Sequence, residues 1–309
     1  MSFTTEIKKE IAYNELKPCC AKAELSALIQ LCSSLQISNQ KLIIAVKTEN
    51  PTTAKRILQL LKAQYDVQTE LSVIRKVKLK KNHIYNLRVM NNAMNILIDL
   101  GIYNEKGLLE HPYASLVTRE CCARAYLAGA FMATGSCNNP TTSNYHLEIV
   151  SITESHAKFI DKLMHRFYLT SKIIERRGKF VVYLKASEKI GDFLRCAGAQ
   201  QNLLEFENVR INRDFKNSLT RLDNCDVANE MKSLKAAEKQ LLDIKKLQDA
   251  GKFDNLDIKL KEVANLRIKY PEHSLNELCN EYKTEQATII SKSGMKHRFV
   301  KIHDLAEKV

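Results

Sequence analysis

The sequence lacks the features that assign a chain to several common protein classes. No apolar run approaches the roughly 20 residues that a membrane-spanning helix needs, and the opening MSFTTEIKKE has no apolar signal core. We therefore expect a soluble cytoplasmic protein that does not enter a membrane. The glycine-rich loops that hold nucleotide phosphates, GxxxxGKS/T and GxGxxG, are also missing. The sequence thus predicts no cofactor.

The nine cysteines show no CxxC spacing, and four of them form two adjacent pairs, Cys19–Cys20 and Cys121–Cys122. An odd number without metal-ligand spacing argues against a disulfide framework and against structural zinc, so we expect buried free thiols and no metal site. Four scattered histidines are expected to be ordinary surface or core side chains: His146, His156, His165 and His273.

The chain carries a net charge of +13, which favours a polyanionic partner. Residues 1–212 hold 29 Lys+Arg against 19 Asp+Glu, giving +10, and residues 213–309 hold 19 against 16, giving +3. The N-terminal part is therefore predicted to be the broad electropositive surface. The C-terminal part depends on local clusters of positive side chains.

One segment of the chain occurs twice. CCAKAELSALIQLCSSL, from residue 19, and CCARAYLAGAFMATGSCNNP, from residue 121, share cysteine, alanine, leucine and serine positions at a constant offset of 121 − 19 = 102. In the second copy, alanines and Gly129 leave one helix surface almost free of side chains. We expect the two helices to pack closely on a pseudo-twofold axis.

The segments that follow also repeat, over about residues 17–101 and 119–198. The first repeat is predicted to contain strand 41–48, helix 51–65, strands 70–75 and 83–89, and helix 92–100. The second is predicted to contain strand 146–153, helix 154–168, strands 172–176 and 180–185, and helix 188–196. Two such units favour one α+β domain with antiparallel sheet.

The sequence LAGAFMATG, at 127–135, resembles the LAGLIDADG helix of homing endonucleases. Together, YLAGAFMATGSCNNP, MSFTTEIKKE and SKSGMKHRFVKI resemble the bacterial WhiA family of sporulation transcription regulators. The resemblance implies an α+β fold, with a duplicated LAGLIDADG-like saddle of αββαββα type at 1–212 and an all-α helix-turn-helix domain at 224–309. It also implies a nucleoid-associated regulator of sporulation or cell division genes that binds double-stranded DNA and works with protein partners in transcription.

The positions that carry the nuclease chemistry of the LAGLIDADG family hold other residues here. That family places one acidic residue at the end of each paired helix, where two carboxylates hold divalent metal. The alignment puts Thr134 and Cys32 at these positions. Hydroxyl and thiol are poor Mg²⁺ ligands. The sequence therefore predicts no catalytic residue and no enzyme activity, which opposes the alternative of an active endonuclease.

The C-terminal part is predicted to be helical after a polar linker at 213–223. A long helix should begin at Asn224 or Asp226 and end at Gly251. Helix 256–270 and a short helix opened by the capping box at 274–277 follow, and a third helix begins near Ser291. Its predicted apolar stripe is Met295, Phe299, Ile302 and Ala306. This is the helix-turn-helix order.

Two groups of residues are candidate DNA contacts. In the third helix, Ser293, Lys296 and His297 are predicted to read bases, and Arg298 and Lys301 are predicted to meet phosphate. Ser291 and Ser293, near the helix start, are also able to bind phosphate, and Lys292 adds positive charge to this DNA-binding segment. Two basic hairpins are predicted to contact phosphates: Arg75, Lys76, Lys78, Lys80 and Lys81 in one, and Arg176, Arg177 and Lys179 in the other. A third class of function, a basic protein that binds RNA or another protein, stays open.

Overall fold

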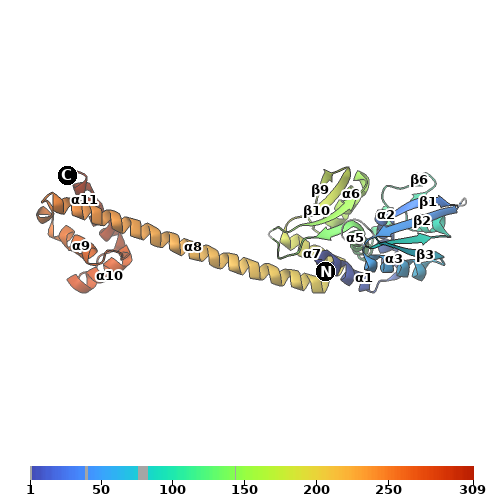
Figure 1. Cartoon of the computed structure of the whole chain (residues 1–309), viewed down its shortest axis with the longest axis horizontal. Coiled ribbons are helices and arrows are strands. Elements are labelled where there is room, and N and C mark those ends of the chain that lie inside the picture. The colour runs from blue at the N-terminus through green and yellow to red at the C-terminus, as the bar shows by residue number, and fades with distance from the viewer. Residues whose placement is uncertain (1, 39–40, 76–82, 143) are drawn as a thin grey trace. The chain divides into compact units, whose positions relative to one another are not determined.

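The computed structural model describes residues 2–38, 41–75, 83–142 and 144–309. The chain forms two compact units, Met1–Arg213 and Asp214–Val309. Figure 1 labels most of the helices and several of the strands. Among the described residues, no helix is long and apolar enough to cross a membrane.

The first unit contains the αββαββα order twice. The first copy consists of α2 (Pro18–Cys32), β1 (Ser33–Ser38), β2 (Lys41–Thr48), α3 (Pro51–Gln64), β3 (Thr69–Arg75), β4 (His83–Val89) and α4 (Ala93–Asp99). The second consists of α5 (Glu120–Thr134), β7 (Gly135–Cys137), β8 (Leu147–Ser151), α6 (Glu154–Arg166), β9 (Lys172–Arg176), β10 (Lys179–Leu184) and α7 (Ser187–Ala197). Between them lie a small hairpin, β5 (Tyr103–Asn104) with β6 (Gly107–Leu108), and the 3-10 turn η1 (Ala114–Val117).

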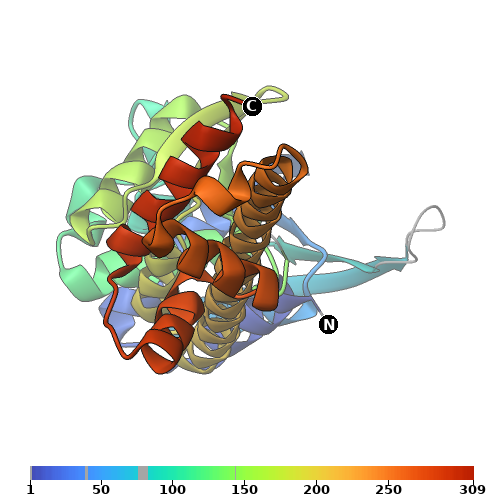
Figure 2. The ribbon, with the colours of Figure 1, turned by 90° about the vertical axis from the view of Figure 1, so that its left-hand side faces the viewer.

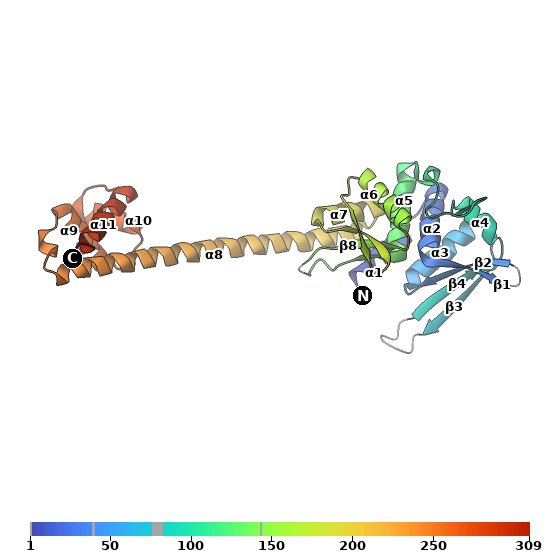
Figure 3. The same cartoon turned by 90° about the horizontal axis from the view of Figure 1, so that it is seen from above.

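Each copy forms a four-stranded antiparallel sheet with the same strand order. The orders are β1-β2-β4-β3 and β7-β8-β10-β9. Helices α2 and α5 lie side by side, with one sheet on each side of the pair (Figures 1 and 3). This arrangement confirms the predicted duplicated α+β fold and the predicted pairing of the two small-residue helices.

Four strands were not located from the sequence: the two-residue strands β5 and β6, and the edge strands β1 and β7 of the two main sheets. β1 and β7 begin directly after α2 and α5, because Ser33 and Gly135 adopt extended backbone conformations. Neither strand has the apolar run of a core strand, and β1 is largely exposed, with Ile37 81% accessible. The entry into β7 is tight, because a Cβ on Gly135 would lie 2.4 Å from the Phe131 ring.

Helix α1 (Phe3–Tyr13) completes the core of the first unit. Phe3, Ile7 and Ile11 recur every fourth residue and are buried. They join side chains from both repeats in one continuous core. The two repeats therefore fold as a single body.

Helix α8 (Gln200–Asp249) differs from the sequence prediction. The expected linker at 213–223 is helical, and the helix starts well before Asn224. The polar composition suggested a linker, but the stretch 199–250 contains neither glycine nor proline, so nothing in it breaks a helix. Residues 214–232 are exposed, and burial in the second unit begins at Ala237.

The second unit contains α9 (Ile258–Lys269), α10 (Leu275–Gln286) and α11 (Lys292–Ala306) together with the end of α8 and the turn η2 (Phe253–Asn255). Figure 2 shows these helices, orange to red, grouped around the end of α8. Ile244 and Leu247 of α8 pack with apolar residues of the other three helices. The predicted capping box of α10 forms, with Ser274 and Glu277 bonding each other's backbone amides.

Candidate nucleic-acid interface

Helix α11 separates a buried face from an exposed one. It begins at Ser291, whose Oγ accepts a hydrogen bond from the Gly294 amide at 3.1 Å. The predicted apolar stripe is buried in the core of the unit: Met295, Phe299, Ile302 and Ala306. The helical spacing of these four residues fixes which side chains face solvent.

The predicted base readers lie on the opposite, solvent-facing side of α11. Ser293, Lys296 and His297 are exposed. Lys301, predicted to contact phosphate, and Lys292, predicted to belong to the DNA-binding segment, are exposed as well. The segment 291–301 contains no acidic residue. As far as Lys301, the exposed face of α11 is therefore positively charged and rich in hydrogen-bond donors.

Arg298, unlike these exposed side chains, is held by contacts with other helices. Its guanidinium donates to the Tyr282 hydroxyl at 2.9 Å and lies 5.2 Å from the centroid of the same ring. The Tyr282 hydroxyl donates in turn to Glu262 at 2.6 Å. Arg298 thus links α11 to α10 and, through Glu262, to α9. Its predicted contact with phosphate competes with these bonds.

Arg267 was not identified from the sequence, although it organises the same unit. It is 1% exposed. Its guanidinium donates to the Gln240 side chain at 3.0 Å and to the backbone oxygens of Tyr270 at 3.2 Å and His273 at 2.6 Å. Burial lowers its pKa to about 10. The only sequence signal was a charged residue directly between two apolar ones, Leu266 and Ile268.

The second basic hairpin is a tight turn between β9 and β10. Arg176 pairs with Lys179 in the ladder, and the two residues between them, Arg177 and Gly178, have positive φ angles of 54° and 69°. This is the two-residue turn typical of hairpins. All three predicted cationic side chains are exposed.

The corresponding hairpin of the first repeat is described only at its ends. Arg75 is exposed at the end of β3, paired with His83. The other predicted residues lie outside the described residues: Lys76, Lys78, Lys80 and Lys81. Because Arg75 and Arg176 hold equivalent places in the two strand orders, the duplication brings positive charge to the same point of each sheet.

Glutamates partly neutralise this charge. In the second sheet, Glu148 accepts from Ser136 at 3.2 Å, lies 3.0 Å from the His146 ring nitrogen and 3.8 Å from Arg176. In the first sheet, Glu70 lies 3.8 Å from Arg88. The sheets are therefore less electropositive than their lysine and arginine content indicates.

The C-terminal end of the α2–α5 pair carries an amine, a thiol and a hydroxyl. Thr134 donates to the Val150 carbonyl at 2.7 Å. Burial raises the pKa of the Cys32 thiol to about 11 and lowers the pKa of the neighbouring Lys8 amine to about 8. A neutral thiol beside an amine is not a site for a hard divalent cation.

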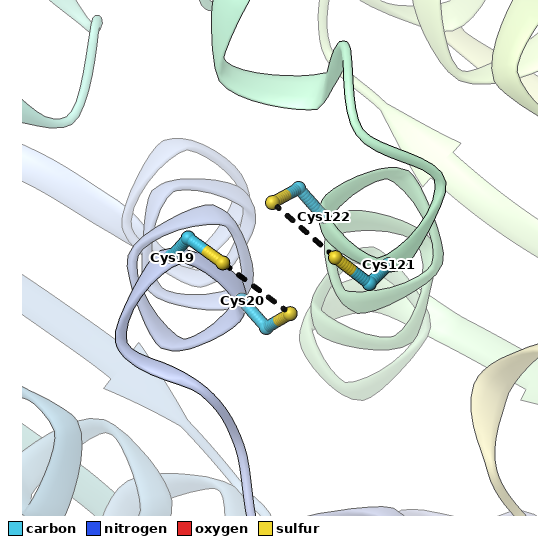
Figure 4. A group of neighbouring side chains, drawn as sticks. All are labelled: Cys19, Cys20, Cys121 and Cys122. Atoms are coloured by element: carbon cyan, nitrogen blue, oxygen red, sulfur yellow. Dashed lines mark hydrogen bonds between the residues drawn. The ribbon is translucent and has the colours of Figure 1, made fainter.

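The N-terminal end of the same helix pair brings together two pairs of cysteines that the sequence analysis treated separately (Figure 4). The Sγ atoms of the four residues all lie within 4.8 Å of one another: Cys19, Cys20, Cys121 and Cys122. All nine cysteines are free thiols, but only Cys20, Cys122 and Cys137 are buried as expected. Cys121 and Cys225 are exposed, and the other four are half-buried. Spacing rules missed the cluster because each pair supplies only half of it.

Three family models match consecutive parts of the chain. The WhiA N-terminal LAGLIDADG-like domain matches residues 18–103, the WhiA LAGLIDADG-like domain matches 123–216, and the WhiA C-terminal HTH domain matches 219–306. The chain belongs to the WhiA family. The resemblance inferred from three short motifs is therefore confirmed, and α11 lies within the helix-turn-helix match.

Curated relatives of this WhiA-family chain are similar over its whole length. The protein named "Probable cell division protein WhiA" of Bacillus licheniformis is 46% identical over 100% of this chain and 97% of its own length. The protein of the same name in Bacillus subtilis strain 168 is 45% identical with the same coverage. These names describe cell division proteins and state no enzyme activity.

Solved structures agree with the fold. Full-length DUF199/WhiA from "Thermatoga maritima" superimposes with a TM-score of 0.60 at 22% identity, covering 100% of this chain and 99% of that one. The N-terminal LAGLIDADG domain of DUF199/WhiA gives a TM-score of 0.51 at 24% identity, covering 67% of this chain and 96% of that one.

Proposed function

We propose that this WhiA-family protein is a sequence-specific, double-stranded DNA-binding regulator of transcription without nuclease activity. One observation carries the proposal: α11 buries its apolar stripe in the unit and turns a basic, donor-rich face outward. The helix-turn-helix order of α9, α10 and α11 is the setting in which such a helix enters DNA.

The dimensions and chemistry of α11 suit a major groove. Its 15 residues span about 22 Å, and a groove about 12 Å wide admits one α-helix. Lys296 and His297 offer donors to base edges such as guanine O6 and N7, and the 45% exposed Val300 offers apolar contact to a thymine methyl. Lys292 and Lys301, toward the helix flanks, suit phosphate oxygens.

The first unit is proposed to add sequence-independent contacts. Arg75, Arg176, Arg177 and Lys179 offer exposed positive charge at equivalent hairpins of the two repeats. Such contacts strengthen binding in a salt-dependent way without selecting a sequence. Lys8, Cys32 and Thr134 supply no carboxylate for a divalent metal ion, which supports DNA binding without metal-dependent cleavage.

The names of the relatives suggest the process. We infer that the regulated genes include cell division genes, and that the protein acts on the chromosome in the cytoplasm with protein partners of transcription. Sporulation genes are a second candidate set, through the family resemblance.

Genome-wide DNA occupancy combined with binding isotherms tests this function. Lys296→Ala and His297→Ala should each reduce discrimination between an occupied site and random DNA, by about 1–3 kcal/mol when a good base contact is lost. Lys301→Ala should weaken both DNAs alike and reduce the salt slope by about one unit. Lys245→Ala, which removes the same charge from exposed helix α8, is the matched control.

If all three α11 variants bind both DNAs as tightly as the wild type does, α11 is not the DNA contact. Equal affinity of the wild-type protein for RNA and for every duplex would favour the alternative of a basic interaction protein.

A further inference from the structure

Four cysteines meet between the starts of helices α2 and α5. Cys19 and Cys20 occupy the second and third positions of α2, and Cys121 and Cys122 occupy the same positions of α5. Figure 4 shows the four side chains pointing into the space between the two helix ends. Because the two repeats are related by a pseudo-twofold axis, each repeat contributes two of the four cysteines.

The sulfur positions fit a single tetrahedral ion. The Sγ atoms of each adjacent pair are 3.9 Å and 4.0 Å apart, and all four lie within 4.8 Å of one another. A zinc ion with Zn–S bonds of about 2.3 Å places its sulfur atoms about 3.8 Å apart. We propose that Cys19, Cys20, Cys121 and Cys122 bind one zinc ion as a closed tetrathiolate site that joins the two repeats.

The ligand chemistry selects the metal. Four sulfur donors favour soft or borderline ions over magnesium, calcium or manganese, and a tetrahedral S₄ set is typical of zinc. With all four positions filled by protein, no site is left for substrate, so the role is structural. Side-chain exposure of Cys121 and partial exposure of Cys19 give the ion a route of entry.

Disulfide formation within each pair is disfavoured. The Cα atoms of adjacent residues are about 3.8 Å apart, whereas a relaxed disulfide needs about 4.4–6.8 Å. Only bonds between the helices, from Cys19 or Cys20 to Cys121 or Cys122, are then available. A disulfide between the two helices is therefore the alternative to metal binding, and alkylation of the free thiols distinguishes the two.

The surroundings favour a negatively charged centre. A zinc tetrathiolate carries a net charge of −2, and the two helix N-termini contribute partial positive charge from free backbone amides. Within the described structure, neither helix start has a side-chain cap hydrogen bond. The N-cap residues are Lys17 and Arg119; Lys17 lines a cavity with Cys20 and Cys121, and Arg119 lines one with Cys19 and Cys122.

The site lies at the end of the helix pair where neither sheet begins. Strands β1 and β7 leave from the C-terminal ends of α2 and α5. Zinc would fix the N-terminal ends and thereby the packing of one repeat on the other. Because α11 belongs to the other unit, loss of zinc is expected to lower the stability of the first unit without removing base discrimination.

Metal analysis of the full-length protein, purified under reducing and anaerobic conditions, tests the site. We expect one zinc ion per chain by mass spectrometry, and a tetrahedral tetrathiolate spectrum when Co²⁺ replaces zinc. Cys121→Ser should lower the zinc content toward zero and weaken the sulfur-to-cobalt charge-transfer band. Cys225→Ser, which changes an exposed cysteine of α8 outside the cluster, should leave both unchanged.

The wild-type protein alone can overturn the proposal. Substoichiometric zinc after growth in zinc-supplemented medium, together with octahedral Co²⁺ bands, would exclude the site. Disulfides between the two helices in freshly isolated, alkylated protein would replace it by a covalent link. If Cys121→Ser does not fold, the wild-type chain can compete with a chelator for Co²⁺, and failure to retain Co²⁺ would exclude the site. DNA binding by α11 is measured in a separate assay, so that failure of the zinc site and failure of the proposed function are distinguished.

Discussion

Substitution of Gly129 should separate the two central helices. A Cβ at this position would lie 2.5 Å from the Glu24 carbonyl oxygen and 3.1 Å from the Ala27 Cβ. The first of these atoms belongs to the backbone of α2, so one helix must move. Overpacking of this kind costs about 1–3 kcal/mol. In Gly129→Ala, the higher helix propensity of alanine offsets up to about 1 kcal/mol of this cost.

The neighbouring ion pair adds to the cost. The Glu24 side chain accepts from Arg56 Nε at 2.7 Å, and Glu24 is 1% exposed. A shift of α2 that opened this pair would leave a buried charge, which costs about 3–5 kcal/mol. We therefore expect Gly129→Ala to cost about 2 kcal/mol, and Gly129→Leu to cost more than about 3 kcal/mol.

Hydrogen exchange resolved by mass spectrometry can assign the effect to individual helices. Tryptophan fluorescence is not possible because the chain lacks tryptophan, and circular dichroism does not separate the two units because both contain helices. Peptides of α2 and α5 should exchange faster in Gly129→Leu while those of α11 stay protected. Gly191→Ala is the matched control for Gly129→Ala, since the nearest atoms to its Cβ belong to side chains, the flexible end of Glu207 at 2.7 Å and Leu203 Cδ1 at 3.4 Å. Unchanged exchange and unchanged urea midpoint in Gly129→Leu would refute the close approach of the helices.

Three further predictions follow from buried or replaced side chains. Arg267→Met should destabilise the second unit by about 3 kcal/mol, because several backbone oxygens lose their donor; unaltered exchange in α9 and α10 would contradict this. His156 Nε2 and the Tyr126 hydroxyl share a hydrogen bond at 2.7 Å, and burial, helped by the charge of His111, lowers the pKa of His156 from 6.5 to about 4. The unfolded chain then binds the proton first, so unfolding free energy should fall by about 2 kcal/mol from pH 7 to pH 5, and His156→Gln should flatten that slope in urea titrations. Supercoiled DNA incubated with the protein and Mg²⁺ or Mn²⁺ should stay intact; nicking by the wild type that is lost in Thr134→Ala would show a catalytic site.

Much of the fold followed from repetition and periodicity. Helices and strands of both repeats lie within two residues of the expected bounds wherever a long apolar pattern marks them, as in β2 and α6. β1 and β7 were missed because they continue directly from helices and lack the apolar run of a core strand. The strands β5 and β6 were missed because two residues are too few to show a pattern. The start of α8 was missed because polar composition says nothing about whether a chain without helix breakers is helical.

In the candidate interface, the sequence predicted the two faces of α11 but not the contacts of Arg298 and Arg267. The buried stripe and exposed face of α11 depend only on local spacing, so Met295 and Lys296 fell on the expected sides. Arg298 is held by Tyr282, sixteen residues earlier in the chain, and Arg267 is held by carbonyls of the following turn. Contacts between segments decide these two cases, and a linear pattern contains no information about them.

The two ends of the central helix pair complement the helix dipoles in opposite ways. A helix carries partial negative charge at its C-terminus and partial positive charge at its N-terminus. The Lys8 amine lies beside Cys32 at the C-terminal end of α2, where a cation is favoured. The four thiols lie at the N-terminal ends, where the negative charge of a metal-bound thiolate set is favoured. The small-residue packing between the ends is compatible with either chemistry. The two ends of the pair thus differ in chemistry, with a hydroxyl, a thiol and an amine at one end and the four proposed zinc ligands at the other, while small residues such as Gly129 set the close contact between the helices.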